Sequence, residues 1–288
     1  MNAELLLRFV LNCDRAYLFA HPEREITDAE RSGYDEALAE RSRGVPAQYI
    51  TGHQEFWGMD LIVTPAVLIP RPETEHVIET ALEVLGTEFR SRALGTGGDP
   101  SAHGPVAASA LVGGASRPLR IADVGTGSGC IALALAKELP HAEIHATDVS
   151  RPALEIARAN AARHQLEHRV QFLQADLLGN LLPPFDLVVS NPPYVGESEE
   201  DQVQLEVRKF EPRTAVFAGH TGTEVIARLI PEARAALRPG GWLVLEVSGT
   251  IAQPVRQLLG GWDAVQITTD LQSLPRVARA RTPPRVSG

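Results

Sequence analysis

Short apolar segments with the character of β-strands alternate with amphipathic helical segments from residue 120 to residue 268. This alternation predicts an α/β fold, in which helices cover both faces of a parallel sheet. Sheets of this kind bind ligands beyond the carboxyl ends of their strands, where the strand order reverses. The expected strands are Arg120–Val124, Glu143–Thr147, Val170–Leu173, Phe185–Ser190, Trp242–Val247 and Ala264–Thr268, and the expected helices are Cys130–Leu139, Pro152–Arg163 and Thr223–Leu237.

The first 90 residues follow a different pattern. Apolar residues at helical spacing and a capping box of Thr27 and Glu30 predict short amphipathic helices, so residues 1–52 form a helical N-terminal domain. Residues 53–90 are predicted to be a β-hairpin and a connecting helix that opens at Pro72. The extended segments of the hairpin region are Glu55–Trp57, Leu61–Val63 and Val67–Ile69, separated by Gly58 and Pro65.

Residues 91–117 show neither helical nor strand periodicity. Of these 27 residues, 6 are glycine, 6 are alanine and 4 are serine, which is typical of a flexible linker or a loop insertion. Because a structureless stretch of this length is uncommon inside a compact domain, we place it at a domain boundary. Residues 118–288 then form the second domain, which contains the sheet.

The overall composition narrows the class of protein. The net charge of −9 argues against a protein that holds long stretches of nucleic acid by bulk electrostatics. Cys13 and Cys130 provide neither a disulfide framework nor the close spacing of a metal site. The longest apolar run, Cys130–Ala136, is far shorter than the roughly 20 residues of a membrane span. We therefore expect a soluble, cytoplasmic protein without a metal and without stable binding to nucleic acid.

A glycine-rich loop, Gly125-Thr126-Gly127-Ser128-Gly129, follows the first expected strand of the sheet. Glycines in such a loop let a ligand lie against the backbone. A dinucleotide fingerprint would need glycine at position 130, where this chain has cysteine, and no Lys-Ser or Lys-Thr pair marks a phosphate loop. The loop therefore indicates a ligand other than a dinucleotide or a nucleoside triphosphate.

Two acids follow the next two strands. Asp148 lies 23 residues after Gly125, close to the spacing at which a carboxylate accepts the hydroxyl protons of a ribose. Asp176 ends the third strand, where it suits an amino donor such as that of adenine. An adenosine-bearing ligand without a required phosphate site indicates S-adenosylmethionine, and the pattern from Asp123 to Gly129 resembles the first motif of class I methyltransferases.

The segment Asn191-Pro192-Pro193-Tyr194 follows the fourth expected strand. The side-chain carbonyl of Asn191 and the backbone carbonyl of Pro192 can each accept one N–H of a planar amino group, which orients its nitrogen and supports the positive charge that develops there. Tyr194 offers a flat face for stacking. The segment predicts methylation of a planar amino group, which can belong to adenine, to cytosine or to a glutamine side chain.

Further stretches carry a family resemblance. Residues 43–56 read RGVPAQYITGHQEF, residues 68–75 read LIPRPETE and residues 210–215 read FEPRTA. Together with the glycine loop and residues 189–194, they resemble the HemK/PrmC family of peptide chain release factor glutamine N5-methyltransferases. The resemblance spans nearly the whole chain except the predicted linker. It implies a class I S-adenosylmethionine-dependent methyltransferase fold, with a Rossmann-like seven-stranded sheet whose last strand is antiparallel.

The resemblance also implies the reaction and the residues that perform it. S-adenosyl-L-methionine is the implied methyl donor, S-adenosyl-L-homocysteine the product, and the glutamine of the Gly-Gly-Gln motif in class 1 release factors the acceptor, with the N-terminal domain docking the release factor. The implied cofactor-binding residues are Gly125, Thr126, Gly127, Ser128, Gly129, Asp148, Asp176, Leu177 and Asn191. The implied catalytic and substrate-binding residues are Asn191, Pro192, Pro193 and Tyr194, with Arg71, Glu73 and Glu75 near the mouth of the active site.

Three alternatives compete with this interpretation. A sister family methylates a glutamine of a large-subunit ribosomal protein, but its counterpart of residues 70–75 usually reads Pro-Arg-Ser-Pro. An N6-adenine nucleic-acid methyltransferase is expected to carry a basic surface or a recognition domain. A non-catalytic interaction protein would have no need of Asn191, Asp148 and the glycine loop. The chain departs from the family in its longer linker, at Leu177, at Val247–Gly249 and in the tail after Asp270.

Overall fold

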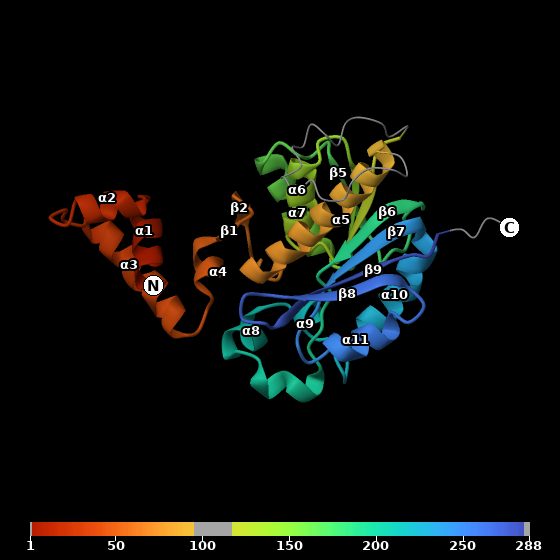
Figure 1. Cartoon of the computed structure of the whole chain (residues 1–288). Helices are drawn as coiled ribbons and strands as arrows, with labels where there is room; N and C mark the ends of the chain where they lie inside the picture. Colours follow the sequence, from red (N-terminus) through yellow and green to blue (C-terminus); the bar gives the residue numbers. More distant parts are fainter. Residues whose placement is uncertain (1, 95–116, 285–288) are drawn as a thin grey trace.

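The computed structural model describes residues 2–94 and 117–284. Figure 1 shows four short helices on the left and an α/β body on the right, in which helices flank a twisted sheet. The hairpin of β1 and β2 lies between these two parts. The predicted α/β fold with a helical N-terminal region is therefore confirmed.

The N-terminal helices surround a small core of their own. The predicted capping box begins the third helix, where the Thr27 hydroxyl oxygen accepts the Glu30 N–H at 3.2 Å and the Glu30 carboxylate accepts the Thr27 N–H at 2.8 Å. The buried residues of this core are Leu6, Ala37 and Ala47. The helices are α1 (Asn2–Leu11), α2 (Arg15–Ala20), α3 (Asp28–Ser42) and α4 (Ala47–Thr51).

The predicted hairpin is formed by β1 (His53–Phe56) and β2 (Met59–Ile62), which pair in antiparallel register. Trp57 and Gly58 form its two-residue turn with φ angles of 53° and 66°. Positive φ at both central residues gives a turn whose twist matches that of the flanking strands. Gly58 has no Cβ and adopts a positive φ without steric cost, whereas Trp57 adopts a backbone conformation that residues with a side chain rarely take.

The extended segment expected at Val67–Ile69 is not a strand; this prediction is wrong. The segment is a buried loop whose backbone groups bond to side chains instead of to a neighbouring strand. The Val67 carbonyl accepts the Tyr49 hydroxyl at 2.7 Å, and the Ile69 N–H donates to the Glu211 carboxylate at 3.1 Å. These partners satisfy two of its backbone polar groups, which a strand would pair with a neighbouring strand instead.

Pro72 begins the predicted connecting helix, as a 3₁₀ turn η1 (Pro72–Thr74) followed by α5 (Glu75–Leu94). Helix α5 continues past position 90 into the stretch 91–117 that we interpreted as a linker, and residues 95–116 lie outside the described residues. At the other end of that stretch, the Arg117 guanidinium binds the buried carboxylate of Asp186 at 2.9 Å.

The sheet of the α/β body has seven strands in the order β5-β4-β3-β6-β7-β9-β8 within the described residues. Strand β9 runs antiparallel to both of its neighbours, β7 and β8, which confirms the antiparallel last strand. The strand order reverses beside β3, which pairs with β4 on one side and β6 on the other. The strands are β3 (Arg120–Val124), β4 (Glu143–Asp148), β5 (Val170–Gln174), β6 (Phe185–Ser190), β7 (Leu237–Glu246), β8 (Asp263–Thr269) and β9 (Pro275–Arg281).

All six strands that the sequence predicts between residues 120 and 268 are present. Strand β7 begins five residues earlier than expected, at Leu237, and the preceding helix ends at Ala236. The sequence pattern did not locate β9, because arginines interrupt its apolar residues. Those arginines have partners in the folded chain: Arg276 binds Asp270 at 2.8 Å and Arg279 binds Glu83 at 2.9 Å.

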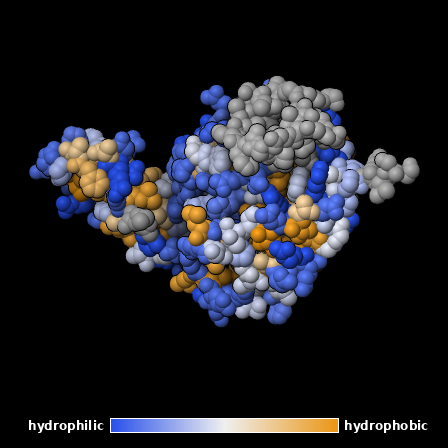
Figure 2. All heavy atoms as spheres, in the orientation of Figure 1, coloured by the Kyte–Doolittle hydropathy of each residue, from blue (hydrophilic) through white to orange (hydrophobic). Residues whose placement is uncertain are grey.

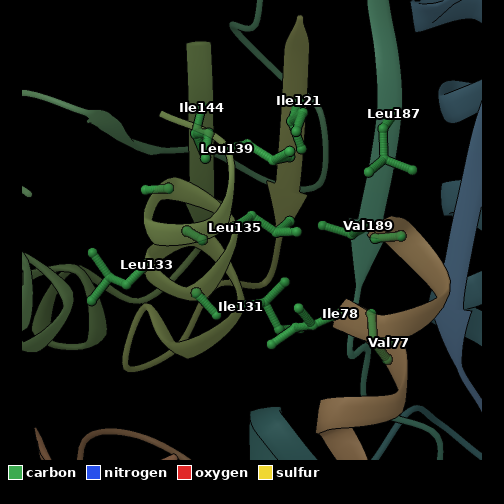
Figure 3. Close-up of a cluster of buried hydrophobic side chains, with 14 of the residues drawn as sticks. Val77, Ile78, Ile121, Ile131, Leu133, Leu135, Leu139, Ile144, Leu187 and Val189 are labelled. Carbon is green, nitrogen blue, oxygen red and sulfur yellow. The ribbon is translucent and has the colours of Figure 1, made fainter. Parts of the chain in front are cut away.

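Helices cover both faces of the sheet, as predicted. Neighbouring strand residues therefore point into two different cores: Ile121 and Val189 pack against α5 and α6, whereas Ala122 and Val188 pack against α10 and α11. Figure 3 shows the first core, where side chains of α6 and α5 lie side by side against the strands. The helices of the body are α6 (Cys130–Glu138), α7 (Arg151–Arg163), α8 (Leu205–Phe210), α9 (Arg213–Val216), α10 (Glu224–Ala236) and α11 (Ala252–Leu258), with a 3₁₀ helix η3 (Glu197–Gln202).

Candidate functional site

A pocket opens at the carboxyl ends of β3, β4, β5 and β6, where the strand order reverses. Its empty volume is about 1130 Å³, part of which is open to solvent. Its walls come from the segment before α5, the glycine loop, the ends of the strands and α10. The sequence-predicted residues among its lining are Gly125, Thr126, Gly127, Ser128, Asp148, Asp176, Leu177, Asn191, Pro192 and Pro193.

The glycine loop presents bare backbone to this pocket. Gly125 and Gly127 have φ angles of 72° and 55°, and no atom lies within 4 Å of the position that a Cβ would take at either residue. The conformation favours glycine, and the open space leaves room for a ligand to approach the chain. The geometry thus agrees with the ligand-binding loop that the sequence predicts.

Asp123, near the end of β3, anchors the glycine loop from below. Its fully buried carboxylate accepts the Thr126 hydroxyl at 2.6 Å and the Ala132 N–H at 3.2 Å. Burial raises the pKa of Asp123 to about 7, although these two hydrogen bonds act in the opposite direction. The loop and the first turn of α6 are therefore held to the strand by one carboxyl group.

Gly129 does not line the pocket, although the sequence groups it with the loop. It is the N-cap of α6, with a φ angle of 85°. A Cβ at this position would lie 3.3 Å from both Leu133 and Ala157. Gly129 therefore allows α6 and α7 to pack closely, which is a structural role.

Asp148 ends β4 beside the glycine loop. One carboxylate oxygen accepts the Gly127 N–H at 2.9 Å, and the other accepts the Ser150 N–H at 2.8 Å. Each oxygen retains a second acceptor position for a ligand hydroxyl. Burial raises the pKa of Asp148 against the effect of these backbone hydrogen bonds, so a ligand that donates protons would satisfy a partly desolvated group.

Asp176 and Leu177 follow β5 and also line the pocket. The Asp176 carboxylate binds the Arg228 guanidinium of α10 at 2.5 Å, and both side chains are more than half exposed. Leu177 has a φ angle of 50°, and its carbonyl accepts the Thr147 hydroxyl at 2.7 Å, which fixes the turn that carries Asp176. Arg228 is a pocket residue that the sequence analysis missed, since a lone arginine on a helix carries no signal.

Asn191 and Pro192 bring two free acceptors to the pocket. The Asn191 side-chain nitrogen donates to the Thr74 hydroxyl oxygen at 3.1 Å, which turns the side-chain carbonyl away from Thr74. Within the described part of the chain, neither the Asn191 side-chain oxygen nor the Pro192 carbonyl accepts a hydrogen bond. The structure therefore leaves unoccupied the two carbonyl oxygens that the sequence analysis singled out.

Tyr194 is not among the residues that line the pocket. Its hydroxyl donates to the carboxylate of Glu246, the last residue of β7, at 3.1 Å. Burial and the nearby Glu246 charge both raise the pKa of Tyr194, so the phenol stays protonated. Glu246 is a further residue that the sequence analysis missed, although its place at the end of a strand next to β6 is a recognisable signal.

The charged residues expected at the mouth do not line the pocket, whereas Thr74, between two of them, does. Arg71 binds Glu211, whose side chain is 1% exposed. Glu75 accepts the Trp57 N–H at 3.0 Å, so it caps the hairpin turn. Glu73 lies within electrostatic reach of Arg276 on β9.

Glu211 joins two walls of the pocket. Besides binding Arg71, it accepts the Ile69 N–H at 3.1 Å, so the segment before α5 is tied to the segment that contributes Pro212 and Thr214 to the lining. In the sequence, this glutamate stands out only as part of the family-like stretch at residues 210–215. Its buried ion pair with Arg71 joins two of the family-like stretches, residues 68–75 and residues 210–215.

The assembled site has a definite chemical character. A bare loop and two acids can hold a nucleoside-like ligand, and free carbonyl oxygens beside it can accept the two N–H groups of a planar amino group. Within residues 2–94 and 117–284, no group of three or more His, Cys, Asp or Glu side chains could hold a metal ion. Across the same residues, no helix is long and apolar enough to cross a membrane.

Comparison with known proteins adds two family matches. Residues 1–52 match the PrmC N-terminal domain, and residues 109–209 match the methyltransferase small domain. The chain is 50% identical over 285 residues to the release factor glutamine methyltransferase of Koribacter versatilis, an alignment that covers 98% of this chain and 91% of the relative. It is 42% identical to the enzyme of the same name from Chlorobaculum tepidum, in an alignment that covers 96% of this chain and 88% of the relative.

Solved structures resemble the chain at the level of the fold. The hMettl16 catalytic domain, solved in complex with a MAT2A 3′UTR hairpin, superposes with a TM-score of 0.58 at 18% identity and covers 84% of this chain and 82% of that chain. A Thermus thermophilus 16S rRNA methyltransferase in complex with AdoMet and guanosine has a TM-score of 0.53 at 20% identity, over 80% of this chain and 49% of that chain. Both are class I methyltransferase folds, in agreement with the seven-stranded topology.

Proposed function

The chain belongs to the release factor glutamine methyltransferase family, and from that premise we propose that it methylates the side-chain amide nitrogen of the Gly-Gly-Gln glutamine in class 1 peptide chain release factors. The observation that carries the proposal is the pair of free carbonyl oxygens, on Asn191 and Pro192, at the floor of the pocket. A primary amide has two N–H groups, which matches two acceptors.

The residues around the loop fit S-adenosylmethionine, which supplies an electrophilic methyl group when bound. Gly125 and Gly127 provide open space against the backbone, and Asp148 retains acceptor positions for two hydroxyl groups. Asp176 would accept an amino group while Arg228 holds its other side, and Leu177 would border the adenine. We place Thr126 and Ser128, which also line the pocket, in the same cofactor site.

The substrate amide would be held by the acceptors of Asn191 and Pro192. Hydrogen bonds from both N–H groups draw electron density toward the nitrogen and stabilise the positive charge that develops on it. Pro193 lines the pocket and stiffens the segment that carries both acceptors, while Tyr194 holds the segment through its hydrogen bond to Glu246. Fixing the nitrogen in line with the methyl group removes most of the entropic barrier.

The N-terminal helices are the proposed docking surface for the release factor. Phe9 and Phe19 are 48% and 68% exposed there, and Figure 2 shows apolar atoms on the surface of this part of the molecule, at the left. Large exposed aromatic side chains are enriched at protein interfaces. The net charge of −9 suits a partner with basic surfaces, as expected of a factor that works on the ribosome in the cytoplasm.

A methylation assay with purified release factor tests this function. The protein and S-adenosylmethionine are incubated with a class 1 release factor, and the Gly-Gly-Gln peptide is analysed by mass spectrometry. We expect the mass of one methyl group on the glutamine, and none with Asn191→Ala, although calorimetry should show that this variant still binds the cofactor. A release factor with glutamine replaced by alanine is the substrate control.

Absence of methylation by a protein that binds S-adenosylmethionine would contradict the proposal. The large-subunit ribosomal protein and an adenine-containing oligonucleotide would then be offered as substrates under the same conditions. Methylation of either one alone would assign the pocket to that alternative.

A further inference from the structure

The two ends of the Asn191–Tyr194 segment are each bonded to a buried side chain outside it. Asn191 donates to Thr74, on the 3₁₀ turn before α5, and Tyr194 donates to Glu246, at the end of β7. Both outside residues are almost completely buried, with exposures of 1% and 3%. The segment is therefore clamped by side chains from two elements that lie far from it in the sequence.

The direction of the Thr74 hydrogen bond decides which atom of Asn191 faces the pocket. An amide side chain can turn by 180° and exchange its oxygen for its nitrogen. With the Thr74 hydroxyl oxygen acting as acceptor, the Asn191 nitrogen is held there and the oxygen is left for the substrate. A hydroxyl that donated its proton to Asn191 would favour the opposite, unproductive orientation.

Glu246 holds the other end of the segment. One of its carboxylate oxygens accepts the Tyr194 hydroxyl at 3.1 Å, and the other has no hydrogen-bond partner among the described residues. Burial raises the pKa of Glu246, while the nearby Thr74, Tyr194 and Arg276 act in the opposite direction. The Asn191 amide and the Tyr194 hydroxyl are therefore held by two separate buried side chains.

Resting on the proposed function, we propose that Thr74 and Glu246 are positioning residues that set the orientation of the Asn191 amide and hold Tyr194 in place. Neither residue needs to touch the reacting atoms. Thr74 holds the nitrogen of the Asn191 amide, Glu246 holds the Tyr194 hydroxyl, and the Asn191 oxygen is left to accept an N–H of the substrate glutamine. The chain of contacts joins β7, the turn before α5 and the segment after β6.

A set of variants at position 74 isolates this role. Thr74→Val keeps the shape of the side chain and removes the hydroxyl, whereas Thr74→Ser keeps the hydroxyl. Thr80→Val is the matched control, because Thr80 is a second buried threonine on the adjoining helix α5. Glu246→Gln keeps the size of the side chain and an oxygen that can accept the Tyr194 hydroxyl, whereas Glu246→Leu removes that acceptor.

The readouts are kcat and KM for methylation of the release factor, the Kd for S-adenosylmethionine and the melting temperature. Loss of the orienting hydrogen bond should lower kcat by about 10- to 100-fold in Thr74→Val. The KM and the cofactor Kd should change by less than about threefold, because a misoriented Asn191 loses stabilisation of the transition state rather than of the bound ground state. Thr74→Ser, Thr80→Val and Glu246→Gln should stay near the wild-type rate, and Glu246→Leu should lose kcat because the Tyr194 hydroxyl loses its acceptor.

Two results would overturn the inference while the proposed function stands: an active wild-type protein whose Thr74→Val variant keeps the wild-type kcat, or equal losses in Thr74→Val and Thr80→Val. A Thr74→Ser variant as slow as Thr74→Val would also overturn it, since the hydroxyl would then not be the operative group. A wild-type protein that leaves the release factor unmethylated refutes the proposed function itself, and with it this inference.

Discussion

The ion pair of Arg71 and Glu211 provides an unusual stability prediction: loss of the more exposed partner should cost more than loss of the buried one. The Arg71 side chain is 34% exposed and the Glu211 side chain 1%. After Glu211→Ala, water can still solvate the arginine, so the main cost is the unpaired Ile69 N–H, about 1–3 kcal/mol. After Arg71→Ala, a buried carboxylate loses its counter-charge, which costs about 3–5 kcal/mol.

A neutral variant separates the charge effect from packing. In Arg71→Ala combined with Glu211→Gln, the glutamine oxygen still accepts the Ile69 N–H and no buried charge remains. The double variant should therefore be more stable than Arg71→Ala alone, by about 1–3 kcal/mol, even though it carries an additional substitution.

Urea unfolding followed by circular dichroism measures these free energies. The cofactor Kd should also rise in Arg71→Ala, because the pair ties together two walls of the pocket. An Arg71→Ala variant that loses less than about 1 kcal/mol, or a double variant less stable than Arg71→Ala, would refute the assignment of an uncompensated buried charge.

Three other predictions concern the glycine loop and its surroundings. Gly129→Ala should destabilise the protein by about 1–3 kcal/mol in urea unfolding, because of its φ of 85° and the Cβ contacts at 3.3 Å; an unchanged midpoint would contradict this. Asp148→Asn should raise the calorimetric Kd for S-adenosylmethionine at least about tenfold while the melting temperature stays within a few degrees, since one ligand hydroxyl loses a charged acceptor; equal affinities would remove Asp148 from the site. Burial raises the pKa of Asp123 to about 7, so the folded state keeps a proton that the unfolded state releases near pH 4. The stability that this proton contributes is therefore present at pH 4 and is lost as the pH rises toward 7. Thermal melts should therefore show that the melting temperature of Asp123→Asn minus that of wild type becomes more positive from pH 4 to pH 7, and a pH-independent difference would show that Asp123 titrates normally.

The sequence alone predicted most of the strands and helices of the α/β body, because both faces of its parallel strands are buried and the resulting apolar runs are easy to recognise. It also predicted that the glycine loop, Asp148, Asp176 and Asn191 would meet. Carboxyl ends of neighbouring parallel strands lie at one edge, so residues after successive strands converge whatever the details of packing. The family resemblance was readable for the same reason: its motifs lie in those loops.

Only the tertiary structure revealed the residues that position other residues of the site. Thr74 and Glu246 lie 172 positions apart, and only the packing of α5 against β7 and β6 brings both to the segment after β6. In the sequence, Thr74 is an inconspicuous residue between Glu73 and Glu75, and those two glutamates were the predicted site residues instead. Charge is visible in a sequence, whereas the direction in which a helix turn presents a side chain depends on how that helix is packed. The partners that orient the site were therefore decided by the fold.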